Sequence, residues 1–134
     1  MFSFLGKEVK GPYGFPSGVV ATNEDTARWM IQNVPQIGWF VGKSTTIDPR
    51  EGNPEDIISQ PAPDSLWNAV GYANPGLEIM IESFRNLRAS VPDDVFLMAQ
   101  IGEGSEEGFE HAVAEYDRAG VVNGIELKIG RAHV

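Results

Sequence analysis

A single lysine follows a short apolar run and is the residue of this chain best placed to do chemistry. The run, 37–41, is too short for a helix and lies between Pro35 and Pro49, so it predicts a buried strand that ends just before Lys43. A lysine in this place either extends to solvent or meets an anion. Because three hydroxyl residues follow it at 44–46, we predict a small-molecule site at this strand end.

The segment after these hydroxyl residues carries a second group of polar residues, at 68–74, and has no helical periodicity. Long connections without secondary structure are usually functional in compact domains. Asn68 offers a donor and an acceptor on one planar group, which suits a ligand edge that presents both, and its alternative role is to bridge the loop. Gly71 would allow close approach of the backbone. Asn74 is expected to cap a helix that begins at Pro75.

The rest of the sequence alternates short apolar runs with segments of helical periodicity. A hairpin is expected around Gly6, joining residues 2–5 to 7–10. The other predicted elements are strands at 13–16, 38–42, 95–99 and 121–127, and helices that begin after Thr22 or Asn23, after Asn74 and after Ser105. Such a pattern is typical of a parallel sheet with helices outside it, in either a doubly wound sheet or a (β/α)8 barrel.

The apolar positions of the predicted helices indicate which faces are buried. In the first helix they are Trp29 and Met30, with Asn33 beside them. The second and third helices carry apolar stripes at steps of three and four, made of Leu77, Met80, Ile81, Phe84 and Leu87, then of Phe109, Ala112, Val113, Tyr116 and Ala119. His111 falls on the polar side of the third helix and is expected to be exposed.

Two further candidates follow predicted strands. Active sites of parallel barrels lie at the carboxyl ends of the strands. Ser17 and Gly18 follow the first strand, where the alternative is a turn leading into the helix, and Gln100 follows the third. The segment 50–54 is expected to form a turn that shapes the long loop.

Composition excludes several classes of function. The chain has 134 residues, one domain at most, with 19 acidic residues against 10 basic ones and a net charge of −9. This balance argues against a nucleic-acid or anionic-membrane surface. With no cysteine there is no thiolate metal site, and we expect no metal. No apolar run approaches membrane-spanning length, so a soluble, cytoplasmic protein is expected.

The motifs also carry a family resemblance. Lys43-Ser44, then R-E-G-N-P at 50–54, N-A-V-G at 68–71 and N-P-G at 74–76 resemble the dihydroorotate dehydrogenase motifs K-[ST], R-x-G-N-P and N-[AS]-[IM]-G-L-x-N in order and spacing. The resemblance covers about residues 4–127. It implies an α/β fold, a parallel (β/α)8 TIM barrel truncated to its first four βα units with an N-terminal hairpin, because a whole barrel takes about 250 residues.

The resemblance further implies a function. It is the FMN-dependent oxidation of dihydroorotate to orotate in pyrimidine biosynthesis, by a soluble enzyme whose intact form is a homo-oligomer. The catalytic base, a Cys or a Ser in the family, would lie beyond Leu127, so this fragment would itself be inactive. The positions that match the family's FMN contacts are Ser17, Gly18, Lys43, Ser44 and Gln100. Those that match its substrate contacts are Lys43, Asn68, Ala69, Val70, Gly71 and Tyr72.

Two departures from the family pattern keep other functions open. Pro16 stands where the family has alanine, and Tyr72 stands where it has leucine. They favour a related FMN oxidoreductase that acts on another dihydropyrimidine or cyclic amide. A non-catalytic half-domain is the third alternative. The electron acceptor is not indicated.

The last seven residues, 128–134, depart from the family pattern abruptly. They match one reading frame of a widely used sequencing adapter, so we predict a non-native tail and a natural chain that continues past Leu127. A divergent natural terminus is the alternative. A barrel cut at this point would expose inward-facing apolar residues, and those expected to face inward are Ile37, Phe40, Val95, Leu97, Ile125 and Leu127.

Overall fold

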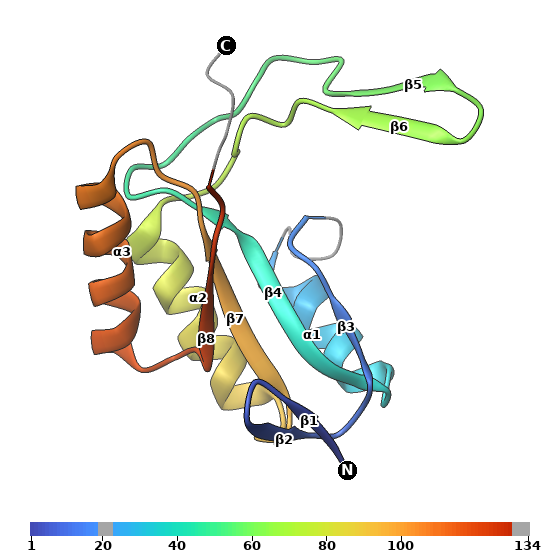
Figure 1. Ribbon diagram of the computed structural model, residues 1–134, viewed down its shortest axis with the longest axis vertical. Helices are drawn as coiled ribbons and strands as arrows, with labels where there is room; N and C mark the ends of the chain where they lie inside the picture. Colours follow the sequence, from blue (N-terminus) through green and yellow to red (C-terminus); the bar gives the residue numbers. More distant parts are fainter. Residues whose placement is uncertain (19–22, 130–134) are drawn as a thin grey trace.

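The computed structural model of the chain describes residues 1–18 and 23–129 (Figure 1). In chain order its elements are β1 Phe2–Phe4, β2 Lys7–Val9, β3 Tyr13–Phe15, α1 Glu24–Asn33, β4 Ile37–Thr45, β5 Ile58–Ala62, β6 Ser65–Asn68, α2 Leu77–Ser90, β7 Phe96–Ile101, α3 Glu106–Ala119 and β8 Gly124–Leu127. No helix of the described ranges is both long and apolar enough to cross a bilayer.

Four strands form one parallel sheet, in the order β3-β4-β7-β8. The three helices lie on one side of it (Figure 1). The predicted parallel sheet with helices outside it is therefore confirmed. Its edge strands in the described part of the chain are β3 and β8, so the sheet is open. The edge position explains why Tyr13, expected in a buried strand, is 66% exposed.

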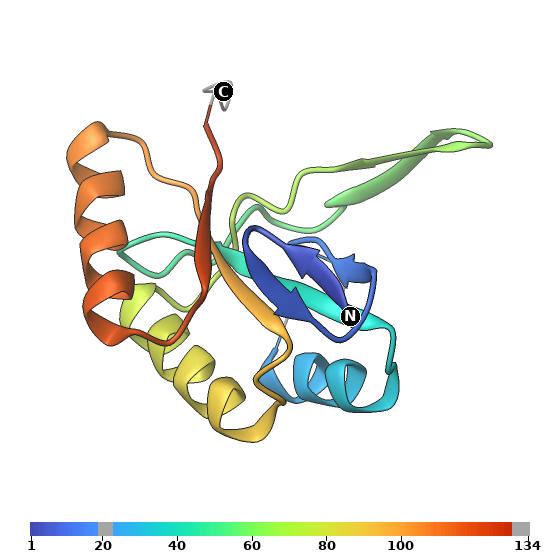
Figure 2. The same ribbon diagram turned by 60° about the horizontal axis from the view of Figure 1, so that its bottom comes forward.

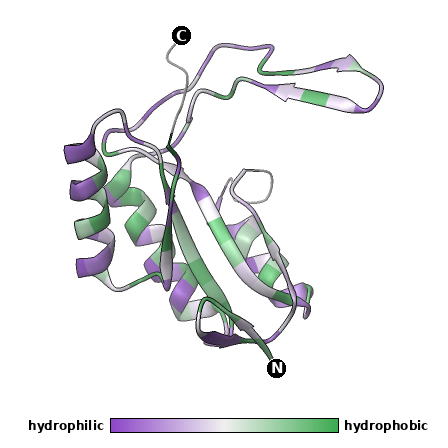
Figure 3. Cartoon of the chain, in the orientation of Figure 1, coloured by the Kyte–Doolittle hydropathy of each residue, from purple (hydrophilic) through white to green (hydrophobic). Residues whose placement is uncertain are grey.

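The main core lies between the sheet and the helices. Residues of β4 and β7 pack there against all three helices, and the hydrophilic side of α3 is turned outward (Figure 3). The predicted stripe of α2 is confirmed, because Leu77, Met80, Phe84 and Leu87 are buried and Ile81 packs beside them.

The predicted buried face of α1 is wrong. Ala27 and Ile31, four residues apart and thus one above the other on the helix, face the core. Trp29 lies on the opposite side and is 60% exposed, Asn33 is exposed and Met30 is half-buried.

A second, smaller cluster lies on the other face of the sheet. It consists of Val9, Val41, Phe96 and Met98, with Phe4 and Trp39 beside them. The β1–β2 hairpin supplies Phe4, whose ring stacks on Trp39 with centroids 5.3 Å apart and meets Phe96 edge-on at 5.1 Å. Figure 2 shows this hairpin on the side of the sheet away from the helices.

The expected inward faces of the strands are therefore wrong. Ile37, Phe40, Val95 and Leu97 belong to the helix-side core, and Ile125 packs against it. Leu127 is 46% exposed. Alternate residues of a strand face opposite sides, so choosing the wrong set reverses both faces. Strands that are apolar on both sides give no alternation from which to choose.

Two of the three expected helix starts are confirmed. Asn23 caps α1 by accepting a hydrogen bond from the Thr26 amide at 2.8 Å, and Ser105 caps α3 by accepting one from the Gly108 amide at 3.1 Å. Gly120 ends α3 in the left-handed conformation, with φ of 63°. His111 is exposed, as expected.

Candidate functional site

An irregularity in the sheet shapes the carboxyl end of β4. Val41 pairs with Met98 and Ser44 pairs with Gln100, so β4 has two residues between these pairs where β7 has one. An extra residue of this kind is a β-bulge, which redirects side chains and is frequent next to active sites. β4 runs on to Thr45, so Lys43 lies inside the strand, not just past its end as expected.

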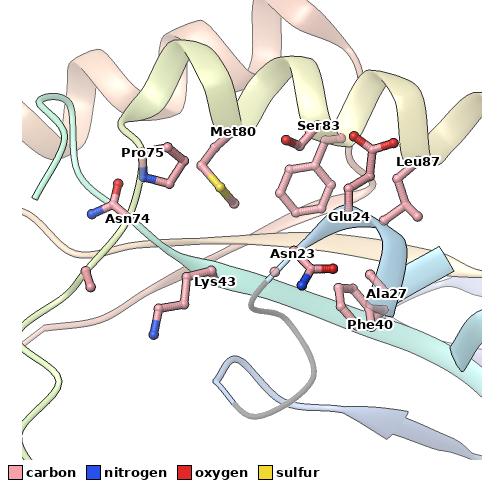
Figure 4. Close-up of a pocket in the computed structure, with 13 residues that line it drawn as sticks. Asn23, Glu24, Ala27, Phe40, Lys43, Asn74, Pro75, Met80, Ser83 and Leu87 are labelled. Atoms are coloured by element: carbon pink, nitrogen blue, oxygen red, sulfur yellow. The ribbon is translucent and has the colours of Figure 1, made fainter. Parts of the chain in front are cut away.

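Lys43 is half-buried at this bulge. Figure 4 shows its side chain pointing away from Pro75 and Met80, which lie on the α2 side of β4. Burial lowers the pKa of Lys43 below its usual value of 10.5, and the positive charge of Lys128 lowers it further. A partly desolvated ammonium group close to a second cation favours an anion, or a ligand atom that becomes negative.

Ser44 begins a row of polar side chains across three strands. Ser44 Oγ donates a hydrogen bond to Gln100 Oε1, and Gln100 Nε2 donates one to Glu126 Oε1. The three residues are direct partners in the strand register of β4, β7 and β8. Thr45 points to the helix side, where its hydroxyl meets Tyr116, so the row lies on the face away from the helices.

Tyr72 covers the carboxyl end of β7. It is buried, with φ of 60°, and a Cβ atom placed on Gly102 would lie only 3.0 Å from the Tyr72 ring atom Cζ. The Nζ atom of Lys128 lies 4.7 Å from the centre of the ring, and the guanidinium carbon of Arg50 lies 6.0 Å from it. The close approach of Gly102 and Tyr72 fixes the end of the long loop over the sheet.

Asn74 holds the loop to β4 and does not cap α2 as expected. Its Oδ1 accepts hydrogen bonds from the backbone amides of Gly76 and Thr46, and its Nδ2 donates to Thr46 Oγ1 and to the Tyr72 carbonyl. The N-cap position is taken by Gly76, whose φ of 92° suits glycine. The helix starts two residues later than expected because the Asn74 side chain is used in this turn.

The long loop contains a hairpin that the sequence reasoning missed. Strands β5 and β6 pair antiparallel, and both views show them projecting away from the parallel sheet (Figures 1 and 2). Asn68 ends β6 and is exposed, paired with Ile58. Asn53 joins the two legs of the loop by donating from Nδ2 to the Ala69 carbonyl at 2.7 Å. The segment 50–54 thus shapes the loop, but it does not form the expected turn.

The structure therefore brings together only part of the predicted site. Lys43, Ser44 and Gln100 meet at the carboxyl edge of the sheet, and Tyr72 packs over it. Ser17 and Gly18 follow β3, the neighbour of β4, at the same edge. Asn68 and Ala69 lie at the base of the projecting hairpin, and Val70 and Gly71 lead back from it toward Tyr72.

Comparison with known proteins decides the family. A sequence model described as dihydroorotate dehydrogenase matches residues 1–130. The chain belongs to the dihydroorotate dehydrogenase family. It is 30% identical to "Dihydroorotate dehydrogenase B (NAD(+)), catalytic subunit" of Latilactobacillus sakei over 98% of this chain and 42% of that protein. It is 29% identical to "Dihydroorotate dehydrogenase A (fumarate)" of Lactobacillus helveticus over 96% of this chain and 41% of that protein.

The chain thus spans about two fifths of the length of these dihydroorotate dehydrogenase relatives. The relatives named here include one type that uses NAD(+) and one that uses fumarate, so the electron acceptor stays open. The sequence prediction of a resemblance to this family is confirmed.

A separate groove of the chain lies between α1 and α2 and measures about 370 Å³. Its walls are mainly apolar, and its lining residues include Phe40, Met80, Phe84 and Asn23. Figure 4 shows Met80 on the α2 side of the groove and Phe40 on the side of the sheet. None of its lining residues except Lys43 belongs to the predicted site. The described residues contain no cluster of acidic or histidine side chains that could hold a metal ion.

Sequence reasoning missed Glu126. Its position at the carboxyl end of the last strand was a usable signal, because neighbouring parallel strands end at the same edge of a sheet. The pairing of Glu126 with Gln100 depends on the strand register, which the sequence does not give.

Proposed function

We propose that the protein containing this stretch oxidises dihydroorotate to orotate in pyrimidine biosynthesis, with FMN as its redox cofactor. The observation that supports this is the meeting of Lys43, Ser44 and Gln100 at the carboxyl edge of a parallel sheet, in a chain of this family. Because the chain spans about two fifths of its relatives, the proposal concerns a longer cytoplasmic protein. In that protein this sheet would form the first half of a (β/α)8 barrel.

The carboxyl edge of the sheet fits a flavin ring. The half-buried ammonium of Lys43 has a lowered pKa, so a ligand edge that becomes negative would offset its desolvation. Ser17, Gly18, Ser44 and Gln100 would supply hydrogen-bonding groups around the ring. When bound, FMN supplies the redox chemistry by accepting a hydride. Lys43 would hold the edge of the ring on which negative charge develops.

The substrate would lie between Lys43 and the segment 68–72. Asn68 would present its donor and acceptor to the pyrimidine edge, and the backbone of Ala69, Val70 and Gly71 would follow its outline. Tyr72 would border the substrate from above the end of β7. For oxidation to orotate, dihydroorotate must lose a proton from C5 and a hydride from C6. We propose that the base that removes the C5 proton lies beyond Leu127. The chain alone is therefore expected to be inactive.

We also propose an origin for the last seven residues of the chain. Residues 128–134 would be non-native, in which case Lys128 is an asparagine or another residue in the natural chain. The nucleotide sequence tests this directly, because codons that differ from the adapter frame would contradict it. Homo-oligomer formation by the intact protein is also proposed.

A second candidate is an FMN oxidoreductase that acts on another cyclic amide. Tyr72 favours it, since its ring stands where the family motif has a leucine and lies against Gly102. A larger polar side chain at this place changes the outline of the substrate pocket.

The test is anaerobic reduction of bound FMN in the protein extended past Leu127 by its natural reading frame. Dihydroorotate should reduce the flavin, and dihydrouracil, which lacks the carboxylate, should reduce it far more slowly. Faster reduction by dihydrouracil would favour the second candidate. An extended protein that binds FMN but is reduced by neither compound would contradict both.

A further inference from the structure

The row of hydrogen bonds across β4, β7 and β8 has a direction. We propose that Glu126 is a positioning residue, which orients the carboxamide of Gln100 and thereby determines what Ser44 and Gln100 offer to a ligand. The identity of that ligand rests on the proposed function. The hydrogen-bond row itself rests only on contacts within the chain.

The direction follows from the chemistry of the three groups. A carboxylate only accepts hydrogen bonds, so Glu126 must meet the NH₂ side of Gln100. The amide oxygen of Gln100 then faces Ser44, and because that oxygen only accepts, the Ser44 hydroxyl must donate to it. The carboxylate of Glu126 therefore fixes the orientation of the Gln100 amide, which could otherwise flip, and of the Ser44 hydroxyl, which could otherwise rotate.

The surroundings hold this arrangement in place. Ser44 is 5% exposed and Gln100 is 8% exposed, so water competes little for their hydrogen bonds. All three residues come from regular strands in direct register, which keeps their backbones at fixed separations. A side chain at position 126 that can both donate and accept hydrogen bonds would leave both orientations of the Gln100 amide available.

The consequence is a defined pattern at the carboxyl edge. The proton of Ser44 is used within the row, so its lone pairs are what it can offer to a ligand. Gln100 uses one N–H on Glu126 and keeps the second as a donor. An acceptor beside a donor is complementary to a ring edge with an N–H next to a C=O, as in lactams and imides. The flavin ring and the dihydroorotate ring both have such an edge. Binding of FMN and binding of the pyrimidine must therefore be measured separately.

The first measurement reads the row without any ligand. In the nitrogen–proton NMR spectrum at pH 7, the side-chain NH₂ pair of Gln100 is assigned by its loss in Gln100→Glu. In Glu126→Gln one proton of this pair should shift upfield, because it no longer meets a carboxylate. The matched control Glu110→Gln removes an exposed carboxylate on α3 and should leave the pair unmoved. An unshifted pair in Glu126→Gln would overturn the proposal.

The second measurement uses an exchange of the two side chains. FMN and orotate are titrated separately against the protein extended past Leu127 by its natural reading frame, in its parent, Glu126→Gln, Gln100→Glu and double-variant forms. Each single variant should bind the sensitive ligand about five- to tenfold more weakly, the effect of one misdirected hydrogen bond. The double variant has a carboxylate at position 100 and lacks the Gln100 donor, so Glu126→Gln should add no further loss to that of Gln100→Glu.

The outcomes separate this proposal from the proposed function. Single losses that do not add in the double variant support the positioning role, and the arm that responds identifies which ring meets Ser44 and Gln100. Parent-like affinity in Glu126→Gln, or losses that add in the double variant, would overturn it. If neither FMN nor orotate binds the extended parent protein, the experiment counts against the proposed function, and the NMR shift still decides the role of Glu126.

Discussion

Tyr116 on α3 and Thr45 on β4 are joined by a hydrogen bond of 3.0 Å between their hydroxyl groups, and both residues are fully buried. This contact ties the outer helix to the strand that carries Lys43. It also fixes which side of β4 faces the helices at this point. Ser44, the next residue back, consequently faces Gln100 on the other side.

This hydrogen bond gives a prediction for stability at high pH. Burial raises the pKa of Tyr116 to about 12, although the hydrogen bond with Thr45 acts in the opposite direction. The unfolded chain ionises this tyrosine near pH 10, and the folded chain holds the proton to about pH 12. The stabilising contribution is therefore complete below pH 10 and is lost between pH 10 and about 12, by about 2–3 kcal/mol in total.

Tyr116→Phe should remove that part of the pH dependence. Urea unfolding of the parent and the variant, followed from pH 8 to 12, measures it as the difference between two curves. Tyr13→Phe is the matched control, because Tyr13 is 66% exposed. A difference between the parent and Tyr116→Phe that stays constant across this range would contradict the assignment.

Asn74 is predicted to stabilise the loop more than Asn53 does. Asn74→Ala leaves the buried hydroxyl and amide of Thr46 without this partner, and should lower the free energy of unfolding by about 2–3 kcal/mol. Asn53→Ala removes a single exposed hydrogen bond to the Ala69 carbonyl and should cost about 1 kcal/mol or less. Chemical unfolding measures both. Equal effects would show that burial of the Asn74 network contributes little.

Lys43 is predicted to reduce stability at neutral pH. Its folded-state pKa is lowered, so the unfolded chain binds this proton more tightly. As pH rises from the lowered pKa through 10.5, the parent should gain stability relative to Lys43→Met, since the unfolded state holds more protons in this window. Unfolding curves at pH 7 and above measure the change. A parent that instead loses stability relative to Lys43→Met over this range would contradict a desolvated lysine.

Much of the fold could be predicted because its signals are local. The caps at Asn23 and Ser105 and the left-handed Gly120 act through neighbouring backbone groups. The continuous apolar runs of β4 and β7 correctly indicated a parallel sheet. The Lys43-Ser44 pair stood out because a charged residue rarely follows such a run.

The rest depends on contacts between distant segments. The bulge at Gly42 and Lys43 appears only when β4 is paired with β7. The apolar strands carry no alternation, so their faces could not be assigned, and the hairpin at 58–68 was hidden by Pro61 and Pro63. Prolines lower the expectation of a strand, but an isolated two-stranded hairpin tolerates them.

The open sheet predicts self-association of the chain. In the part of the chain that the structure describes, β3 and β8 are edge strands, and unpaired strand edges join other chains. Light scattering should show a mass that rises with concentration above that of one chain. Leu127→Lys, which places a charge on the β8 edge where Leu127 is 46% exposed, should shift the mass toward the monomer. A parent that stays monomeric and binds FMN at about micromolar affinity would contradict this prediction.

The central claim is that Lys43 acts on the flavin and substrate at the carboxyl edge of the sheet. It is tested most directly by rapid anaerobic mixing of dihydroorotate with the FMN-loaded protein, extended past Leu127, in parent, Lys43→Ala and Lys7→Ala forms. Lys7 lies on the β1–β2 hairpin and serves as the matched control. We predict that Lys43→Ala slows flavin reduction by dihydroorotate about tenfold or more in a protein that stays folded, and that the flavin of Lys7→Ala is reduced at the parent rate. Parent-like flavin reduction in a folded Lys43→Ala protein would contradict the claim.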